Sequence, residues 1–392
     1  MKILSVNAGS SSLKFPLFEM PEKEVIVNGT FEKIGLDNSF YTIKYNGEKV
    51  TKEASLPTHK EAVEILLNEL IDMKIINSYE EIKGIGHRVL HGGDVYFDSV
   101  KVNQDVMDKI EELFPLGPLH NPANLIGIKS FISVLPNTPQ VAVFDTAFHQ
   151  TMDKEEYIYP IPFDWFIKYG VRKYGFHGTS HKYISKFISD SLNKNPKLIN
   201  CHIGNGASIC AIKDGKCIDT SMGLTPLAGI MMGSRSGDID PSIIPYVMKQ
   251  TGLSAEEIVT KLNKESGVLG ISGISSDMRE VEKGYLENDE RCVLAFNMYV
   301  KKIINYISMY NTLLEGAEVI TFTAGVGENS DLIRKLVCDK LKCLGVILDD
   351  NKNNGLRGKF EKISSTDSKI DVYVVPTDEE VMIAKDTYDL IN

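Results

Sequence analysis

Two stretches of similar pattern, one in each half of the chain, constrain the fold more than any other feature of the sequence. Residues 3–15 comprise an apolar run, a turn of small residues and a second strand-like run. Residues 198–212 repeat this order around the small polar turn 204–206. Apolar runs of this length predict β-strands. The likeness lies in the pattern rather than in the letters, and it predicts an internal duplication in which each domain begins with a glycine-bearing hairpin.

The turn of the first stretch has a composition that suits phosphate binding. Residues 7–12 carry little bulk, so backbone N–H groups and hydroxyls can approach a ligand closely. Lys14 adds a positive charge just beyond the turn. An ordinary β-hairpin has the same composition, so this stretch alone leaves both interpretations open. Two such turns facing each other across a cleft would clamp the phosphates of a nucleotide.

The order of strand-like and helix-like periods along the rest of the chain predicts an α/β layer fold. In the first half we expect short strands up to residue 51, a helix over 59–76, a strand over 84–90, a helix that Asn121 caps and Pro122 begins, and a strand over 140–144. In the second half we expect a helix over 289–314, a strand over 318–323, a glycine-rich turn over 324–330, a helix from Asp331, a strand over 372–375 and a final helix with Thr377 and Glu380 as its capping box.

Composition narrows the class of protein. A length of 392 residues predicts two or three domains, and a net charge of −10 argues against nucleic-acid binding but not against an anionic substrate. No apolar run is long enough to span a membrane, and the N-terminus runs straight into a strand, so we expect a cytoplasmic protein. The six cysteines include no C-x-x-C pair, which predicts buried thiols rather than disulfides or a zinc site.

Three side chains stand where α/β proteins often place functional groups. Arg88 lies beside glycines at the end of a strand, and Arg235 lies among glycines and serines. The planar fork of an arginine suits carboxylate or phosphate oxygens. A structural salt bridge, for Arg235 with a nearby aspartate, is an equal alternative. Asp145 ends the strand 140–144, a common location of a catalytic or metal-binding carboxylate, although a turn aspartate fits equally well. Walker, full Rossmann and nucleophile-elbow motifs are absent, and the pairs His87/His91 and His177/His181 lack the glutamate of metalloproteases.

Ten motifs, in order along the whole chain, resemble those of acetate kinase, of the acetate and sugar kinase, Hsp70 and actin superfamily. They are residues 7–14, 87–93, 118–122, 144–149, 172–181, 202–206, 233–238, 275–279, 325–329 and 376–380. The resemblance implies the reaction of ATP with acetate to give ADP and acetyl phosphate, with Mg²⁺ (or Mn²⁺), in a homodimer. It also implies two duplicated ribonuclease-H-like (actin-like ATPase) domains with the active site in the cleft between them: residues 1–149 with 380–392, and residues 150–379.

The resemblance also implies roles for individual residues. The implied catalytic residues are Asp145, His177, Arg235, Arg88 and His120. The implied substrate-binding residues are Arg88, Leu90 and Phe176. The implied metal-binding residues are Asn7 and Glu379. The implied nucleotide-binding residues are Lys14, His202, Ile203, Gly204, Asn205, Gly206, Asp277, Met278, Arg279, Gly325, Val326, Gly327, Glu328 and Asn329. A carboxylate acceptor is already ionised at pH 7 and needs no general base, so we interpret Asp145 as a group that orients a metal-bound water or an arginine.

Two positions depart from the expected pattern. Pro16 falls where the second strand would continue, which a sheet tolerates only at an edge or a bulge. Leu90 stands where many members of the family carry valine, and the extra methylene could narrow the acid pocket. A methylene is worth only ~1–3 kcal/mol, so we expect a preference among acids rather than a switch.

Three other functions compete with this interpretation. A propionate or butyrate kinase of the same family would differ in its rates across short fatty acids. A kinase with pyrophosphate or another non-ATP donor would not be stabilised by ATP. An Hsp70-like or actin-like protein would use ATP to drive partner binding, but it would have no purpose for Arg88, His120 and His177. The sequence leaves the dimer surface open, with the helix over 289–314 as a candidate.

Overall fold

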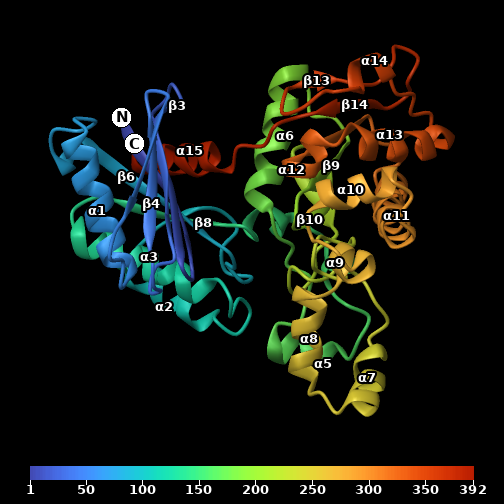
Figure 1. The fold of residues 1–392 in the computed structure, drawn as a ribbon, viewed down its shortest axis with the longest axis horizontal. Coiled ribbons are helices and arrows are strands. Elements are labelled where there is room, and N and C mark those ends of the chain that lie inside the picture. Colours follow the sequence, from blue (N-terminus) through green and yellow to red (C-terminus); the bar gives the residue numbers. More distant parts are fainter. The chain divides into compact units, whose positions relative to one another are not determined.

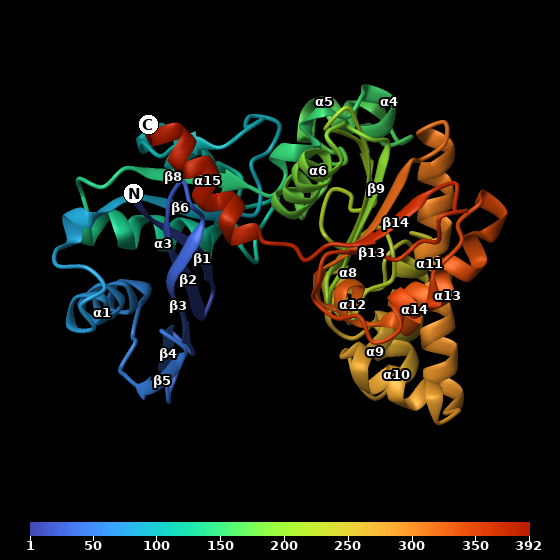
Figure 2. The same ribbon diagram turned by 90° about the horizontal axis from the view of Figure 1, so that it is seen from above.

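The opening hairpin lies within an eight-stranded sheet in the first of two units of the chain. The computed structural model describes residues 1–392; unit 1 comprises residues 1–148 and 378–392, and unit 2 comprises residues 149–377. Figures 1 and 2 show both as ribbons, and the last helix, in red, lies with the blue strands of unit 1. None of the helices is both long and apolar enough to cross a membrane.

The sheet of unit 1 mixes an antiparallel half with a parallel one. Its strands are β1 (Lys2–Gly9), β2 (Ser12–Glu19), β3 (Glu24–Glu32), β4 (Phe40–Tyr45), β5 (Glu48–Glu53), β6 (Ile82–Val89), β7 (Val100–Lys101) and β8 (Gln140–Phe144), in the order β5-β4-β3-β2-β1-β6-β8-β7. Its helices are α1 (His59–Asp72), the short η1 (Tyr79–Glu81), α2 (Gln104–Glu112), α3 (Asn121–Val134) and α15 (Glu379–Ile391). β1 pairs antiparallel with β2 and parallel with β6, and β6 pairs parallel with β8.

Helices cover both faces of this sheet. Successive side chains of a strand point to opposite faces, so the apolar side chains on each face need a helix to bury them. Leu4 belongs to the core that also contains residues of α1 and α3, whereas its neighbour Ile3 packs with Ala384 of α15. Two glycines of β6 let α15 approach the backbone. A Cβ atom on Gly86 would lie 2.3 Å from the Thr387 hydroxyl, and one on Gly84 would also meet α15.

The strand β2 accommodates Pro16 without being at an edge. It lies between β1 and β3, and Pro16 is in register with Asn28 of β3. The ladder between β1 and β2 skips the positions of Phe15 and Pro16, because proline has no N–H to donate there. The expectation of a β-bulge is met one residue later, where the register with β3 shifts between Leu17 and Phe18.

Unit 2 repeats the central part of the first sheet. Its strands are β9 (Leu198–Ile203), β10 (Ala207–Lys213), β11 (Lys216–Thr220), β12 (Val319–Thr323), β13 (Glu361–Lys362) and β14 (Asp371–Val374), in the order β11-β10-β9-β12-β14-β13. β9 pairs antiparallel with β10 and parallel with β12, and β12 pairs parallel with β14. The series β11-β10-β9-β12-β14 therefore has the order and directions of β3-β2-β1-β6-β8. The predicted α/β class and internal duplication are confirmed.

The helices of unit 2 range from 4 to 24 residues in length. They are η2 (Ala147–Thr151), α4 (Lys154–Tyr157), α5 (Phe163–Tyr169), α6 (Gly178–Leu192), α7 (Ile243–Thr251), α8 (Ala255–Lys264), α9 (Gly267–Ser272), α10 (Met278–Leu286), α11 (Glu290–Leu313), α12 (Ala324–Asn329), α13 (Asp331–Lys340), η3 (Leu341–Leu344) and α14 (Asp350–Asn353). α11 buries one face along its length, from Cys292 to Tyr310. Ser330 caps α13, and Asp289 caps α11.

Three local predictions were wrong, two of them because a side chain has a partner that the sequence does not reveal. Asn121 does not cap α3 but is its first residue, and its amide binds the backbone of His91 instead. The cap of α15 is Asp378, since the hydroxyl of Thr377 hydrogen bonds to Ser180. The expected turn over residues 324–330 is mostly the short helix α12.

The cysteines are all free thiols, and five of the six are buried, as predicted; Cys343 is exposed. Three potential metal ligands nevertheless lie together in unit 2. The ligand atoms of His149, Cys210 and Cys217 are within 4.8 Å of one another, with His149 Nδ1 3.1 Å from the Cys217 sulfur. The thiol of Cys210 donates a hydrogen bond to the sulfur of Cys217, at a distance of 3.4 Å.

Candidate active site

Arg88 and Asp145 form a bidentate ion pair where two parallel strands of unit 1 end. Arg88 lies in β6, and Asp145 directly follows β8. Arg88 donates from Nε to both carboxylate oxygens, at 3.1 and 3.2 Å, and from Nη2 to Oδ2 at 2.6 Å. Asp145 is fully buried, and the coulombic attraction of its carboxylate raises the pKa of Arg88 above its usual value. This geometry suits a carboxylate that orients the guanidinium.

The other edge of the Arg88 guanidinium approaches a second acidic group. Its Nη1 lies 3.9 Å from Oε2 of Glu379, at the start of α15. Burial raises the pKa of Glu379 to about 7; the charges of Asp145, Glu380 and Asp378 act in the same direction, and Arg88 opposes them. The single cation Arg88 therefore faces several carboxylates, so the negative charge at this site exceeds the positive charge.

The opening hairpin brings its two predicted functional side chains together. Asn7 and Lys14 are directly opposite in the ladder of β1 and β2, so their side chains share one face of the sheet. Asn7 is half-buried and Lys14 is exposed. Leu90 is buried just after β6, and His120 is exposed at the N-cap of α3.

Two asparagines of α3 position the loop after β6, and sequence reasoning did not assign them to the site. Asn121 Oδ1 accepts from the backbone N–H of His91, and Asn124 Oδ1 accepts from that of Leu90, both at 3.0 Å. Asn124 also donates to the carbonyl of Ala8 in β1. Both asparagines are buried. Polar residues on the predicted buried face of a helix are the signal that could have identified them.

In unit 2, three predicted residues surround the glycine turn between β9 and β10. A Cβ atom on Gly206 would lie 3.5 Å from Arg235 Nη1 and 3.6 Å from His177 Nε2, so both nitrogens reach the same small region. The imidazoles of His177 and His202 stack, with centroids 4.2 Å apart. His177 has a positive φ of 58° at the N-cap of α6. Such a backbone conformation is uncommon for a side chain of this size and often marks a functional position.

Arg235 is half-buried and has no carboxylate partner. Its Nη1 donates to the carbonyl of Pro226 at 3.0 Å, and burial lowers its pKa. The alternative of a salt bridge to a neighbouring aspartate is not realised. Asp238 accepts instead from the N–H of Gly229 and from the Tyr306 hydroxyl. A desolvated guanidinium without an anion favours an anionic ligand at this position.

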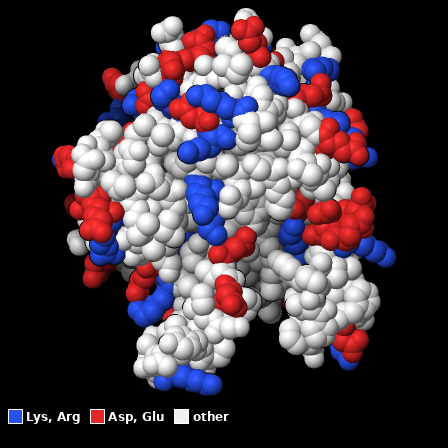
Figure 3. Space-filling view, turned by 90° about the vertical axis from the view of Figure 1, so that its right-hand side faces the viewer, with Lys and Arg blue, Asp and Glu red and all other residues white.

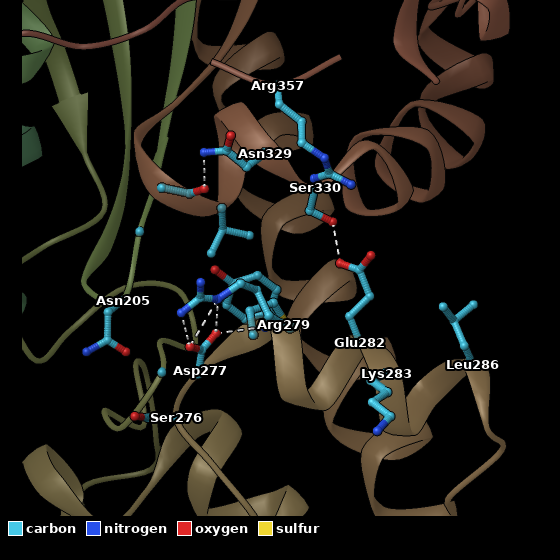
Figure 4. Close-up of a pocket in the computed structure, with 16 residues that line it drawn as sticks. Asn205, Ser276, Asp277, Arg279, Glu282, Lys283, Leu286, Asn329, Ser330 and Arg357 are labelled. Carbon is cyan, nitrogen blue, oxygen red and sulfur yellow. Dashed lines mark hydrogen bonds and ion pairs between the residues drawn. The ribbon is translucent and has the colours of Figure 1, made fainter. Parts of the chain in front are cut away.

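A pocket of about 1000 Å³ opens beside the turn between β9 and β10, whose residues Gly204 and Asn205 line it (Figure 4). Helix α10 supplies Glu282 and Lys283 to one wall, and Asn329 and Ser330 stand on another. Eight predicted nucleotide-binding residues line it: Gly204, Asn205, Asp277, Met278, Arg279, Gly325, Val326 and Asn329. Lining residues that the sequence did not predict are Gly233, Ser276, Glu282, Lys283, Leu286, Tyr299, Ser330 and Arg357.

The remaining predicted nucleotide residues of unit 2 are not among the pocket's lining. They are His202, Ile203, Gly206, Gly327 and Glu328. The carboxylate of Glu328 accepts from the backbone N–H groups of Ala324, at 2.7 Å, and Thr377, at 3.0 Å, so it holds the turn in shape. Phe176 is buried, and its carbonyl lies 2.9 Å from His149 Nε2. The structure places Phe176 within unit 2, and its contact with substrate stays a prediction.

Comparisons with known proteins agree on one family. The acetokinase family matches residues 2–385. The chain is similar to the acetate kinase of Geobacillus sp. (strain WCH70), 52% identical over 394 residues, covering 100% of this chain and 99% of that protein. It is similarly related to the acetate kinase of Bacillus subtilis (strain 168), at 51% identity over 388 residues and 98% of each chain.

Solved structures resemble the fold over the same length. The crystal structure of Porphyromonas gingivalis acetate kinase has a TM-score of 0.96 and 48% identity, and covers 100% of both chains. A propionate kinase from Francisella tularensis subsp. tularensis SCHU S4 has a TM-score of 0.94 and 42% identity, and covers 99% of both chains.

The raised pKa of Glu379 predicts a pH-dependent stability. Between the usual pKa near 4.5 and about 7, the unfolded chain loses this proton while the folded chain keeps it, so folding weakens as the pH rises. We expect Glu379→Gln, measured without divalent cations, to melt at a higher temperature than the wild type at pH 8 and at the same temperature at pH 4.5. An equal difference at both values would contradict the predicted titration.

Proposed function

This chain belongs to the acetokinase family, and we propose that it transfers a phosphoryl group reversibly between ATP and acetate, giving ADP and acetyl phosphate. As a member of that family, it is a phosphotransferase whose acceptor is a carboxyl group. The observation that carries the proposal is Arg235, a half-buried arginine without a carboxylate, in the same unit as a large pocket lined by glycine turns. This combination suits the phosphate chain of a nucleotide.

The acceptor is proposed to bind at Arg88 in unit 1. Because acetate is ionised at neutral pH, it attacks without a general base, and the protein has to position it and offset its charge. Asp145 holds the Nε and Nη2 edge of Arg88, which leaves the Nη1 edge for the acid. Asp145 is therefore an orienting group in this proposal. Leu90 offers an apolar surface for the methyl group, and His120 is a further candidate contact.

The donor is proposed to bind in the pocket of unit 2. Gly204 and Gly325 allow the backbone to approach a ligand, and a Cβ atom on Gly325 would meet open space. Lys14 of unit 1 is proposed to neutralise phosphate charge. Arg235 and His177 converge on the region beside Gly206, where they can stabilise the three equatorial oxygens of the transferred group. Catalysis in this scheme consists of positioning and charge stabilisation.

A divalent cation, Mg²⁺ or alternatively Mn²⁺, is proposed to bind at Asn7 and Glu379. The residues fit such an ion, because oxygen donors are what these cations prefer. Burial is the main cause of the raised pKa of Glu379, and the carboxylates of Asp145, Glu380 and Asp378 add negative charge around it. When bound, the cation would neutralise charge on the phosphoryl oxygens. Glu379 must lose its proton to serve as a ligand, so binding should weaken below about pH 7.

We further propose a cytoplasmic homodimer. Six free cysteines are typical of a reducing compartment. Acidic and basic side chains alternate on the face drawn in Figure 3, without the broad basic surface of a nucleic-acid-binding protein. Large apolar side chains are exposed on two short helices of unit 2, with Trp165 and Tyr169 on α5 and Tyr246 on α7. They support a second copy as the partner there. The helix α11, which the sequence suggested, buries one face and exposes Leu294 and Met309.

Sedimentation tests the dimer directly. We expect the wild type to sediment as two chains, and a Trp165→Glu, Tyr246→Glu variant to shift toward one chain, because buried charges without partners weaken an interface. Lys168→Glu, an exposed change on the same helix α5, is the matched control. A wild type that sediments as a single chain at micromolar concentration would contradict the proposal.

The choice of acid is tested by trapping acyl phosphates with hydroxylamine. We expect the highest kcat/KM with acetate, and lower values with propionate and butyrate. Propionate is the alternative to weigh, because one structural neighbour is a propionate kinase at 42% identity. In Leu90→Val the ratio of propionate to acetate should rise about tenfold, since one methylene is worth ~1–3 kcal/mol. A wild type that prefers propionate would overturn the assignment, and a failure of ATP to raise the melting temperature would overturn the donor.

Arg235 should be the most sensitive position in unit 2. By analogy with arginines that stabilise phosphoryl transfer, Arg235→Ala should lower kcat by ~10³-fold or more with a small effect on KM. Arg279→Ala, which removes an exposed arginine paired with Asp277 at the pocket, should mainly raise the KM for ATP. A loss of less than about tenfold in Arg235→Ala would count against its role at the transferred group.

A further inference from the structure

A line of hydrogen-bonded side chains runs through unit 2 and ends at His177. Thr321 Oγ1 donates to Asn200 Oδ1 at 2.7 Å, and Asn200 Nδ2 lies 2.8 Å from His181 Nδ1. His181 Nε2 lies 2.8 Å from the Ser208 hydroxyl, which lies 2.9 Å from His177 Nδ1. The four residues behind His177 are completely buried, and they come from β12, β9, α6 and β10. This set of five side chains is called the His177 chain below.

The chemistry of the groups fixes the direction of the His177 chain. An amide nitrogen only donates, so His181 Nδ1 must accept from Asn200. Burial lowers the pKa of His181 well below its usual value, and the charges of His149 and His202 act in the same direction, so its ring is neutral. A neutral imidazole carries one proton, and that proton must be on Nε2. His181 therefore donates to the hydroxyl of Ser208.

The same logic carries one step further. The Ser208 hydroxyl has one proton, and since it accepts from His181, that proton is available for His177 Nδ1. With Nδ1 as the acceptor, neutral His177 carries its proton on Nε2. This is the nitrogen that faces the region next to Gly206, which Arg235 Nη1 also reaches. The opposite tautomer would turn a lone pair toward an anionic oxygen there.

We propose that Ser208, with His181 and Asn200 behind it, is a positioning residue that holds His177 as the neutral tautomer with its proton on Nε2, ready to donate to an oxygen of the transferred phosphoryl group. The proposal rests on the proposed function of His177. Ser208, His181 and Asn200 do not touch substrate in this scheme, and each acts through the next. The His177 chain provides a hydrogen-bond donor, Nε2 of His177, whose direction is set before the substrate binds.

The tautomer can be measured directly by NMR of the protein labelled with ¹⁵N at histidine. The resonances of His177 are assigned from their loss in His177→Gln. We expect Nδ1 to be unprotonated and Nε2 protonated in the wild type, and a mixture of tautomers in Ser208→Ala. A wild-type His177 with its proton on Nδ1 would overturn the proposal, and this measurement needs no variant to be active.

Kinetics supply a second readout with matched variants. We expect Ser208→Ala to lower kcat at least about tenfold, while the KM values for ATP and acetate stay within about twofold. Ser208→Thr keeps the hydroxyl and should recover most of the kcat. Ser221→Ala is the control, because the Ser221 hydroxyl is buried and accepts only from a neighbouring strand, at Ile209 N, outside the His177 chain. An unchanged kcat in Ser208→Ala, or an equal loss in Ser221→Ala, would contradict the proposal.

One more variant separates this inference from the proposed function on which it rests. If His177→Ala keeps its kcat, the function proposed for His177 is wrong, whichever tautomer it has. If His177→Ala loses activity while the wild type has its proton on Nδ1, only the His177 chain is wrong. Loss of activity together with the Nε2 proton supports both.

Discussion

A buried carboxylate at the end of a parallel strand governs how unit 1 is arranged. Asp145 is fully buried, and an ionised carboxylate away from water costs several kcal/mol unless a cation pairs with it. Arg88, one strand away, meets this need with a bidentate contact. The contact depends on the parallel register of β6 and β8, so the ion pair and the sheet specify each other. It also leaves the Nη1 edge of the guanidinium outside the contact with Asp145, and this is the edge proposed to bind the acid.

Unit 2 presents the opposite electrostatic arrangement. Arg235 is half-buried, and its nearest polar partner is a backbone carbonyl rather than a carboxylate. The energetic cost of that desolvation is acceptable if an anion completes the contact during the reaction. The duplicated fold therefore carries two arginines in different environments: Arg88 is paired with a buried carboxylate, and Arg235 has no carboxylate partner. The His177 chain adds a neutral donor beside the second of these.

The sequence predicts the framework of both units better than their polar details. Apolar runs and glycine turns locate the strands, because burial and backbone freedom act within a few neighbouring residues. Hydrogen-bond partners that are distant in sequence leave no such local pattern. Glu328 belongs to a predicted nucleotide turn, yet its carboxylate binds the N–H of Thr377. In the sequence, Ser208 is one more small residue of a strand. In the structure, its hydroxyl lies within hydrogen-bond distance of both His181 and His177. The motifs predict candidate residues, and the tertiary contacts show that some of them, such as Glu328, hold a turn in shape.

The return of α15 to the first sheet has a consequence for the order in which the protein is made. Unit 2 is a continuous segment, residues 149–377, whereas unit 1 needs residues from both ends of the sequence. Until α15 has been synthesised, the face of the sheet that contains Ile3 and Val143 lacks its cover. Glu379 is also supplied at that moment, as the first residue of α15. During translation the second unit can thus be complete while the first still exposes an apolar face, and the helix that closes that face also delivers the last proposed ligand of the metal.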